Sequence, residues 1–229
     1  MTTATAAERL GVSQRQVQRL IASGELPAAR TAGDAWVVDA VVLNALTRTR
    51  PARGRPWSPA VAWAALWQLS GLHHDWLDRR SASRLSRRLA ELRVDGLLHA
   101  CRRRAIVHRY RVSESFLPEF EGFLIRTGTS AMSVDTFGMV PDRSRFDGYC
   151  ADYALDDLVR RFHLIDDPRG NATIRVTNLL KDEFGRRREM PLAVVAADLA
   201  ESIEARERAA GRRLLEQALH SSSCPTNDG

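Results

Sequence analysis

The first fifty residues show two helical runs of apolar positions separated by a break. The apolar positions are Ala6, Ala7 and Leu10 in the first run, and Val17, Leu20 and Ile21 in the second. Gly11 lies between them and favours the left-handed conformation in which helices commonly end. Ser13, with Gln16 three residues later, is a capping pattern for the start of the second helix. The pattern predicts two helices joined by a tight turn.

The following segment, ELPAARTAGDAWVVD, contains two short extended runs around Ala32-Gly33-Asp34. A glycine between two such runs predicts a β-hairpin, because the turn needs a positive φ angle. Asp39 then caps a predicted third helix with an apolar stripe at Val42, Leu43 and Leu46. Helix, turn, helix, hairpin and helix in this order predict a winged helix-turn-helix domain over residues 1–47.

The rest of the chain divides into a linker, a larger domain and a tail. Residues 48–57, RTRPARGRPW, combine prolines, a glycine and arginines and predict a basic linker. Residues 58–219 predict a C-terminal α/β regulatory domain, and 220–229 a disordered tail.

The expected elements are helices from Ser58-Pro59, over about 83–92, over 155–162 and over 192–219 (one or two), and strands over 105–112 and 172–176. Because two helices lead into the first strand, residues 58–112 are a candidate second winged-helix-like unit. The predicted fold class is mainly α with small β elements (α+β).

Charge changes the picture because it is distributed unevenly. Residues 1–112 carry 19 arginines against 8 acidic residues, a net charge of +11. Residues 113–229 carry 15 basic and 20 acidic residues, a net charge of −5. The basic N-terminal half indicates that this part of the chain binds a polyanion, whereas the acidic C-terminal half has a different function.

Composition narrows the class of protein. The 229 residues are 44% hydrophobic and 27% charged, which is typical of a folded globular chain. No segment has the roughly 20 consecutive apolar residues of a membrane span, and the start MTTATAAERL lacks the apolar core of a signal peptide. Three widely spaced cysteines fit a reducing compartment. We therefore expect a cytoplasmic protein that does not act at a membrane, as a monomer or a homodimer.

The second predicted helix carries the residue types that read DNA bases. Its polar face holds Gln14, Arg15, Gln18 and Arg19, and glutamine and arginine form paired hydrogen bonds with adenine and guanine in the major groove. Arginines in the hairpin and the linker are expected to hold phosphates or to enter the minor groove. The predicted DNA-binding residues are Ser13, Gln14, Arg15, Gln18, Arg19, Arg30, Arg48, Arg50, Arg53 and Arg55. The arginines at 79, 80, 84, 87 and 88 either extend this surface or form the outer face of an amphipathic helix.

The run AAERLGVS at 6–13, with Leu26-Pro27, Gly33 and Trp36, resembles the excisionase/MerR-type winged helix of bacterial regulators. This resemblance covers about the first fifty residues and implies sequence-specific binding to double-stranded DNA. Wings of that type usually carry basic residues around the tryptophan, whereas this chain has Asp34 and Ala35. Arg30 and the linker arginines are expected to compensate.

Residues 57–219 resemble the C-terminal part of AbiE-type antitoxins, through WSPAVAWAALWQLSG, IVHRYRV, LIRTGTSA and MPLAVVAADLAESIEARERAAGRRLLEQAL. The resemblance implies a transcriptional repressor that binds inverted repeats in its own promoter and opposes a nucleotidyltransferase-like toxin. Two alternatives stay open. One is an excisionase-like architectural factor, for which the long C-terminal region is unnecessary, and the other is a protein-interaction module that neutralises an enzyme directly.

An enzyme is the least favoured class. A nucleotidyltransferase requires a Gly-Ser loop followed by two carboxylates one residue apart that hold a divalent metal. Gly128-Thr129-Ser130 is followed by Asp135, but Phe137 occupies the partner position. His73-His74-Asp75 lacks the spacing of a metal site, since neighbouring side chains diverge. We therefore predict no catalytic residues, no metal site and no cofactor, and that the protein is not an enzyme.

Overall fold

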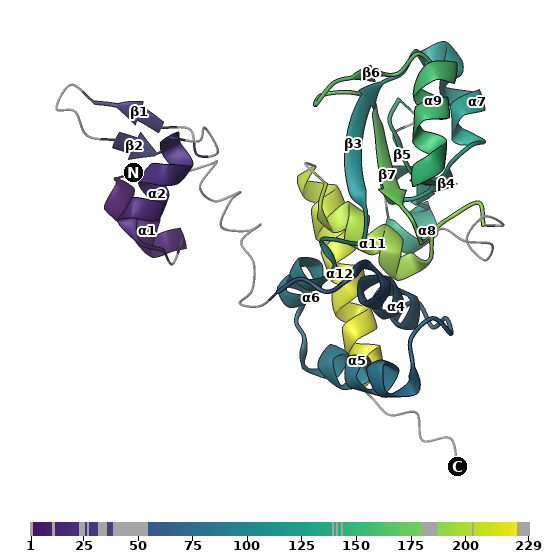
Figure 1. Ribbon diagram of the computed structural model, residues 1–229, viewed down its shortest axis with the longest axis horizontal. Helices are drawn as coiled ribbons and strands as arrows, with labels where there is room; N and C mark the ends of the chain where they lie inside the picture. The colour runs from purple at the N-terminus through teal and green to yellow at the C-terminus, as the bar shows by residue number, and fades with distance from the viewer. Residues whose placement is uncertain are drawn as a thin grey trace. The chain divides into compact units, whose positions relative to one another are not determined.

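The computed structural model shows two compact units, Met1–Arg53 and Gly54–Gly229 (Figure 1). The residues that the structure describes are 2–10, 12–22, 26, 28–31, 36–38, 55–138, 140, 142, 144–179, 187–202 and 204–223. The division falls inside the predicted linker 48–57. The limits 1–47 and 58–219 stay predictions.

The first unit contains two helices and a two-stranded sheet. α1 spans Thr3–Leu10 and α2 spans Gln14–Ala22, and antiparallel β1 (Ala28–Arg30) and β2 (Trp36–Val38) form the hairpin. Its buried core consists of Ala6, Ala7, Leu10, Val17, Leu26 and Val38. The predicted helices and hairpin are confirmed. The third helix expected from Asp39 lies outside the described residues.

Local side-chain bonds fix the ends of the two helices. The Thr5 amide donates to the Thr2 hydroxyl at 3.2 Å, and the Gln16 amide donates to the Ser13 hydroxyl at 3.3 Å. These bonds satisfy amide donors that have no partner within a helix. The cap predicted at Ser13 is therefore present, and Thr2 caps α1 in the same way.

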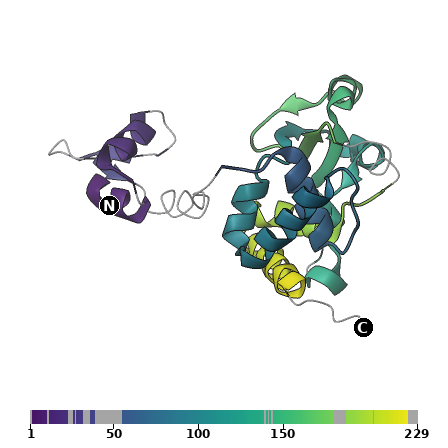
Figure 2. The same ribbon diagram turned by 60° about the horizontal axis from the view of Figure 1, so that its bottom comes forward.

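A bundle of helices makes up one part of the second unit. These helices are α4 (Pro59–Leu69), α5 (Arg79–Glu91), α6 (Val94–Cys101), α11 (Leu192–Ala200) and α12 (Ala205–Ser223). α11 is apolar on nearly every side and buried from Ala193 to Ala200, as expected for a helix at the centre of a core. Trp63 and Trp67 are buried in the same core, and their ring centres lie 6.0 Å apart. Figures 1 and 2 show α4, α5, α6 and α12 gathered at one end of the sheet.

A mixed five-stranded sheet forms the other part, in the order β4-β5-β7-β3-β6. The strands are β3 (Ile106–Arg111), β4 (Ile125–Arg126), β5 (Phe146–Ala151), β6 (Ile165–Asp166) and β7 (Ala172–Thr177). β5 and β7 are parallel, and the other neighbouring pairs are antiparallel. Short helices connect the strands: η1 (Glu114–Phe116), α7 (Leu117–Glu121), η2 (Gly128–Ala131), α8 (Val134–Phe137), η3 (Asp152–Ala154) and α9 (Leu155–Arg161).

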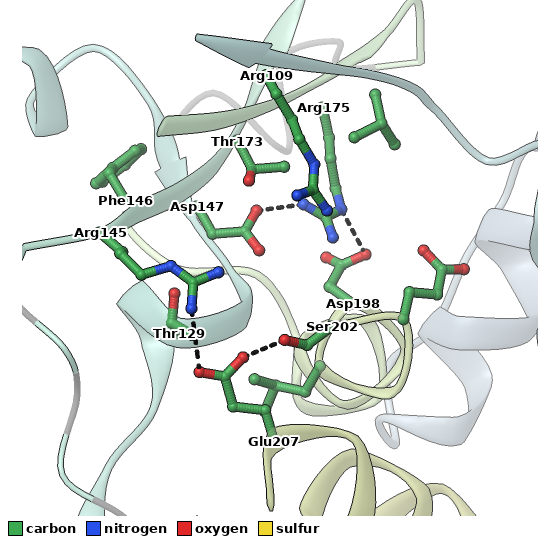
Figure 3. A pocket seen from close by; sticks show the side chains of 13 residues that line it. Arg109, Thr129, Arg145, Phe146, Asp147, Thr173, Arg175, Asp198, Ser202 and Glu207 are labelled. Carbon is green, nitrogen blue, oxygen red and sulfur yellow. Dashed lines mark hydrogen bonds and ion pairs between the residues drawn. The ribbon is translucent and has the colours of Figure 1, made fainter. Parts of the chain in front are cut away.

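The two faces of the sheet differ in chemistry because side chains alternate along each strand. One face is apolar and packs against α7 and α9 through a cluster that includes Phe120, Phe146, Phe162 and Ile174. The opposite face carries Arg109, Asp147, Thr173 and Arg175 and lies toward α11 and α12 (Figure 3). Charged side chains therefore occupy the space between the sheet and the helical bundle.

Three expectations from the sequence need correction. Residues 58–112 are not a separate winged-helix unit, because their strand β3 lies inside the sheet and pairs with β7 and β6. The helix expected over 83–92 begins earlier, at Arg79, because the Asp78 carboxylate caps the amides of Arg80 and Ser81 at 2.9 Å. α12 continues to Ser223, so residues 220–223, which were predicted as part of a disordered tail, are helical. The predicted fold class, α+β with an N-terminal helix-turn-helix domain, is confirmed.

Candidate nucleic-acid interface

The outer face of α2 is a strip of exposed polar side chains. Val17 is fully buried against α1, whereas Arg15, Gln18 and Arg19 are exposed. Positions three and four apart lie on the same side of a helix, so these three side chains form one surface. The width of an α-helix fits the major groove of DNA, where such side chains reach base edges.

Only part of the predicted strip is available to bind DNA. Within the described residues, the side chains of Arg15, Gln18 and Arg19 make no hydrogen bond or ion pair. Gln14 differs, because its side-chain amide donates a hydrogen bond to the Thr3 hydroxyl at 2.9 Å and so connects α2 to α1. Ser13 is occupied as the helix cap. Arg15, Gln18 and Arg19 are therefore the candidate base-reading residues.

The hairpin presents one of the predicted arginines. Arg30 is exposed on β1, and its guanidinium carbon lies 4.9 Å from the centre of the Trp36 ring on β2. This cation–π contact holds the charge at the edge of the hairpin. Arg55 is also exposed. Arg48, Arg50 and Arg53 lie outside the described residues.

A second basic surface lies on α5, in the other unit. Its exposed arginines are Arg79, Arg80, Arg84, Arg87 and Arg88. Leu85 and Leu89 bury the opposite face, so α5 is amphipathic. Arg88 lies 5.1 Å from the ring centre of the buried Trp57 and covers it. At least this arginine has a structural role in addition to its charge.

The second unit contains a buried network of charges that the sequence did not reveal. Asp198 on α11 accepts a hydrogen bond from the Arg104 guanidinium at 2.5 Å and another from the Tyr149 hydroxyl at 3.1 Å. Its second carboxylate oxygen accepts a bond from the Thr127 hydroxyl. Arg175 lies 2.9 Å from Asp198 and also pairs with Asp147. The network joins the sheet to the helical bundle.

Burial and the arginine charges act in opposite directions on the two acids. Burial disfavours the ionised form of Asp198, but the charges of Arg175 and Arg104 outweigh it, and the pKa of Asp198 is lowered. Burial raises the pKa of Asp147 to about 7, although the nearby Arg175 charge opposes the shift. The ionised carboxylate at the centre of the network is therefore Asp198.

Single charges inside apolar elements are the signal in the sequence from which this network could have been expected. In AVVAADLA, Asp198 is the only charged residue of an otherwise apolar helix. Arg175 likewise stands alone in the strand sequence ATIRVT. A single charge inside an apolar element indicates a buried partner. The identity of that partner depends on tertiary structure.

The turn at Gly128 lies beside a carboxylate, as a nucleotidyltransferase site requires. Gly128 has a φ angle of +49°, and the Asp147 amide donates to the Ser130 hydroxyl at 2.8 Å. The residue two positions after Asp147 is Tyr149, however, and Asp147 is paired with Arg175. The pair of carboxylates one residue apart does not form at this turn.

The described part of the chain offers no cluster of metal ligands. It contains no group of three or more His, Cys, Asp or Glu side chains arranged to hold a metal ion. His73 and His74 have ring centres 6.2 Å apart, and His74 packs against Trp76. None of the described helices combines the length and apolar character needed to cross a bilayer.

Comparison with known proteins identifies the first unit alone. Residues 1–51 match a family model described as a helix-turn-helix domain. No curated protein and no solved structure matches the chain. The match covers α1, α2 and the hairpin, and it agrees with the exposed strip on α2. The chain therefore carries an N-terminal helix-turn-helix DNA-binding domain.

Proposed function

We propose that this chain is a sequence-specific transcriptional repressor that acts as the antitoxin of a toxin–antitoxin pair. In this proposal it binds repeats in its own promoter and opposes a nucleotidyltransferase-like toxin, without catalysing a reaction itself. The observation that carries the DNA-binding part is the exposed strip Arg15, Gln18 and Arg19 on the second helix of a helix-turn-helix. The antitoxin part rests on the resemblance of residues 57–219 to AbiE-type antitoxins.

The mechanism of repression follows from the chemistry of the strip. Arginine–phosphate contacts release counterions and supply affinity that does not depend on sequence. Paired hydrogen bonds from Arg15, Gln18 and Arg19 to base edges supply the sequence preference. A repressor bound in this way occupies the promoter and excludes the polymerase.

A second candidate function is favoured by the size of the second unit. Gly54–Gly229 forms a compact body with two apolar clusters of its own. DNA recognition by the first unit does not require such a body, and an excisionase-like factor has no use for it. A protein-binding activity that neutralises a partner enzyme, separable from DNA binding, would account for it.

The first test is binding of the full chain to its own upstream region. Labelled upstream DNA and a scrambled duplex of equal length are titrated at moderate ionic strength and compared by fluorescence anisotropy. We expect the upstream region to bind more tightly by a factor of at least about 1,000, the lower end of the usual range for specific over non-specific binding. Equal affinities would refute the proposed repressor function.

The antitoxin part needs a separate measurement. The genes on either side of this one are read first, since the proposal requires a nucleotidyltransferase-like gene among them. Growth is then followed in cells that co-express that gene with the wild-type chain or with the double variant Arg15→Ala, Arg19→Ala. Protection that survives the double variant would favour direct neutralisation through the second unit. Loss of protection, with the double variant present at the wild-type protein level, would show that protection requires promoter binding. No toxicity from the neighbouring gene would refute the antitoxin role.

The linker gives a prediction about salt. Replacing Arg53 and Arg55 with alanine should reduce the slope of log affinity against log salt by about one for each phosphate that the variant no longer neutralises. Sequence preference should not change, because phosphate contacts carry no sequence information. Arg160→Ala, an exposed arginine on α9, is the matched control. A slope equal to that of the wild type would remove Arg53 and Arg55 from the interface.

A further inference from the structure

A cavity of about 130 Å³ lies between the polar face of the sheet and the α11–α12 region (Figure 3). Its walls come from β3, η2, β5, β7, α11 and α12, so elements distant in sequence meet there. The lining residues include Arg109, Thr129, Arg145, Asp147, Thr173 and Arg175. The second unit alone builds this cavity, and DNA binding by α2 does not use it.

The carboxylates of the wall are already engaged. Asp147 pairs with Arg175, and Asp198 accepts bonds from Arg104, Tyr149 and Thr127. Glu201 accepts two hydrogen bonds from Arg104, and Glu207 accepts one from the Ser202 hydroxyl and forms an ion pair with Arg145. Because these acids have partners, little of their charge remains to bind a cation or to neutralise a further arginine.

Several donors on the same wall keep hydrogen-bonding capacity for a ligand. Within the described residues, the Arg109 guanidinium and the hydroxyls of Thr129 and Thr173 make no hydrogen bond or ion pair. Arg145 forms an ion pair with Glu207 at 3.9 Å (Figure 3), a distance too long for a hydrogen bond, so its N–H groups make no hydrogen bond within the described residues. The Nε atom of Arg175 is fully buried and forms an ion pair with Asp198 at 2.9 Å, but no hydrogen bond.

The register of the sheet brings two of the positive charges together. Arg109 on β3 lies directly across from Thr173 on β7, and Val107 lies across from Arg175. Arg109 and Arg175 are therefore diagonal neighbours on one face, a separation of about 7–8 Å between backbones. Asp147 is bonded to Arg175 and leaves Arg109 without compensation. An anion between these side chains would relieve the repulsion.

We propose that this cavity binds the phosphate group of a small phosphorylated compound, held by Arg109 and Arg145 and by the hydroxyls of Thr129 and Thr173. Guanidinium groups bind phosphate oxygens through paired, charge-assisted hydrogen bonds. A phosphate group presents three terminal oxygens to these four donors, whereas a carboxylate presents two. Figure 3 shows the donors entering from different elements, which suits a tetrahedral group.

The size of the cavity limits the ligand. A single water needs about 10–15 Å³ on the comparable scale, and drug-sized pockets begin at about 300 Å³. A volume of about 130 Å³ accommodates a phosphate group with a short carbon body and is too small for a whole nucleotide. Val107 and Leu199 supply the apolar contact for that body.

The test is calorimetric titration of the full chain at moderate ionic strength. The probes are inorganic phosphate, glycerol 3-phosphate, adenosine monophosphate and acetate. We expect saturable binding of glycerol 3-phosphate, weaker binding of inorganic phosphate and no binding of acetate. Tighter binding of inorganic phosphate than of the ester would identify free phosphate as the ligand and overturn the proposed carbon body. Tightest binding of the nucleotide would overturn the size argument.

Two variants connect the binding to these residues. Arg109→Gln and Thr173→Val should each weaken glycerol 3-phosphate binding by about tenfold or more, as expected when a charge-assisted or buried hydrogen bond is removed. The exposed Arg160→Gln is the matched control and should bind as the wild type does. Thermal unfolding of each variant without ligand shows that it is folded. Binding unchanged in Arg109→Gln, or no phosphate probe binding the wild type, would overturn the proposal and leave the promoter-binding test unaffected.

Discussion

Replacing Asp198 with alanine should lower the free energy of unfolding of the second unit by about 3–5 kcal/mol. The side chain of Asp198 is fully buried, and that of Arg104 is 3% exposed. Removing the carboxylate leaves Arg104 with Glu201 and Arg175 with Asp147, so the two buried arginines lose the acid that they share, in a region from which water is excluded. The measurement is denaturant unfolding followed by tryptophan fluorescence, since Trp63, which lies 5.2 Å from Tyr149, reports on this region.

Two further substitutions separate the charge from the change in volume. Asp198→Asn keeps the size and one acceptor oxygen but removes the charge, so most of the destabilisation should remain. Asp157→Ala removes a carboxylate that is 77% exposed and paired with Arg160, and it should change stability by no more than about 0.5 kcal/mol. Equal effects of Asp198→Ala and Asp157→Ala on the free energy of unfolding would show that the buried network contributes no more to stability than an exposed ion pair does.

The first unit was predictable because its signals are local. Ser13 and Gln16 are three residues apart, and the amide-to-hydroxyl bond between them forms within one helical turn. The apolar stripe with Val17 at its centre identifies the buried face of α2 without any knowledge of the rest of the chain. Polar types on the opposite face then indicate the surface that binds DNA. One residue of that face, Gln14, is used inside the unit, which spacing alone does not reveal.

The second unit was less predictable because its defining contacts join distant residues. The alternating pattern of β3 identifies a strand but contains no information on its partner, and β7 lies far later in the chain, with Arg109 paired to Thr173. Arg104 and Asp198 are 94 residues apart in sequence. The polar cavity depends on the register of β3 against β7, since a shift by one residue would turn Arg109 to the apolar face. Such contacts require a structure.

Arg19→Ala should weaken binding to the upstream DNA by about 1–3 kcal/mol, or roughly 5- to 150-fold, if Arg19 reads a base. Its guanidinium is exposed on α2 and makes no hydrogen bond or ion pair within the described residues, so the substitution removes no such bond inside the unit. Stability should therefore stay within about 0.5 kcal/mol of the wild type. The measurement is a titration of upstream and scrambled DNA with the wild type and the variant at one salt concentration.

The comparison of the two duplexes decides which contact Arg19 makes. Weaker binding to the upstream DNA with little change on the scrambled duplex means that Arg19 reads a base edge. Equal weakening on both means a phosphate contact, and an unchanged affinity removes Arg19 from the interface. Gln14→Ala is the matched control on the same helix: because Gln14 is bonded to Thr3, its removal should lower stability more than it lowers affinity. A control variant that binds as weakly as Arg19→Ala does, with unchanged stability, would place Gln14 on the DNA-reading surface.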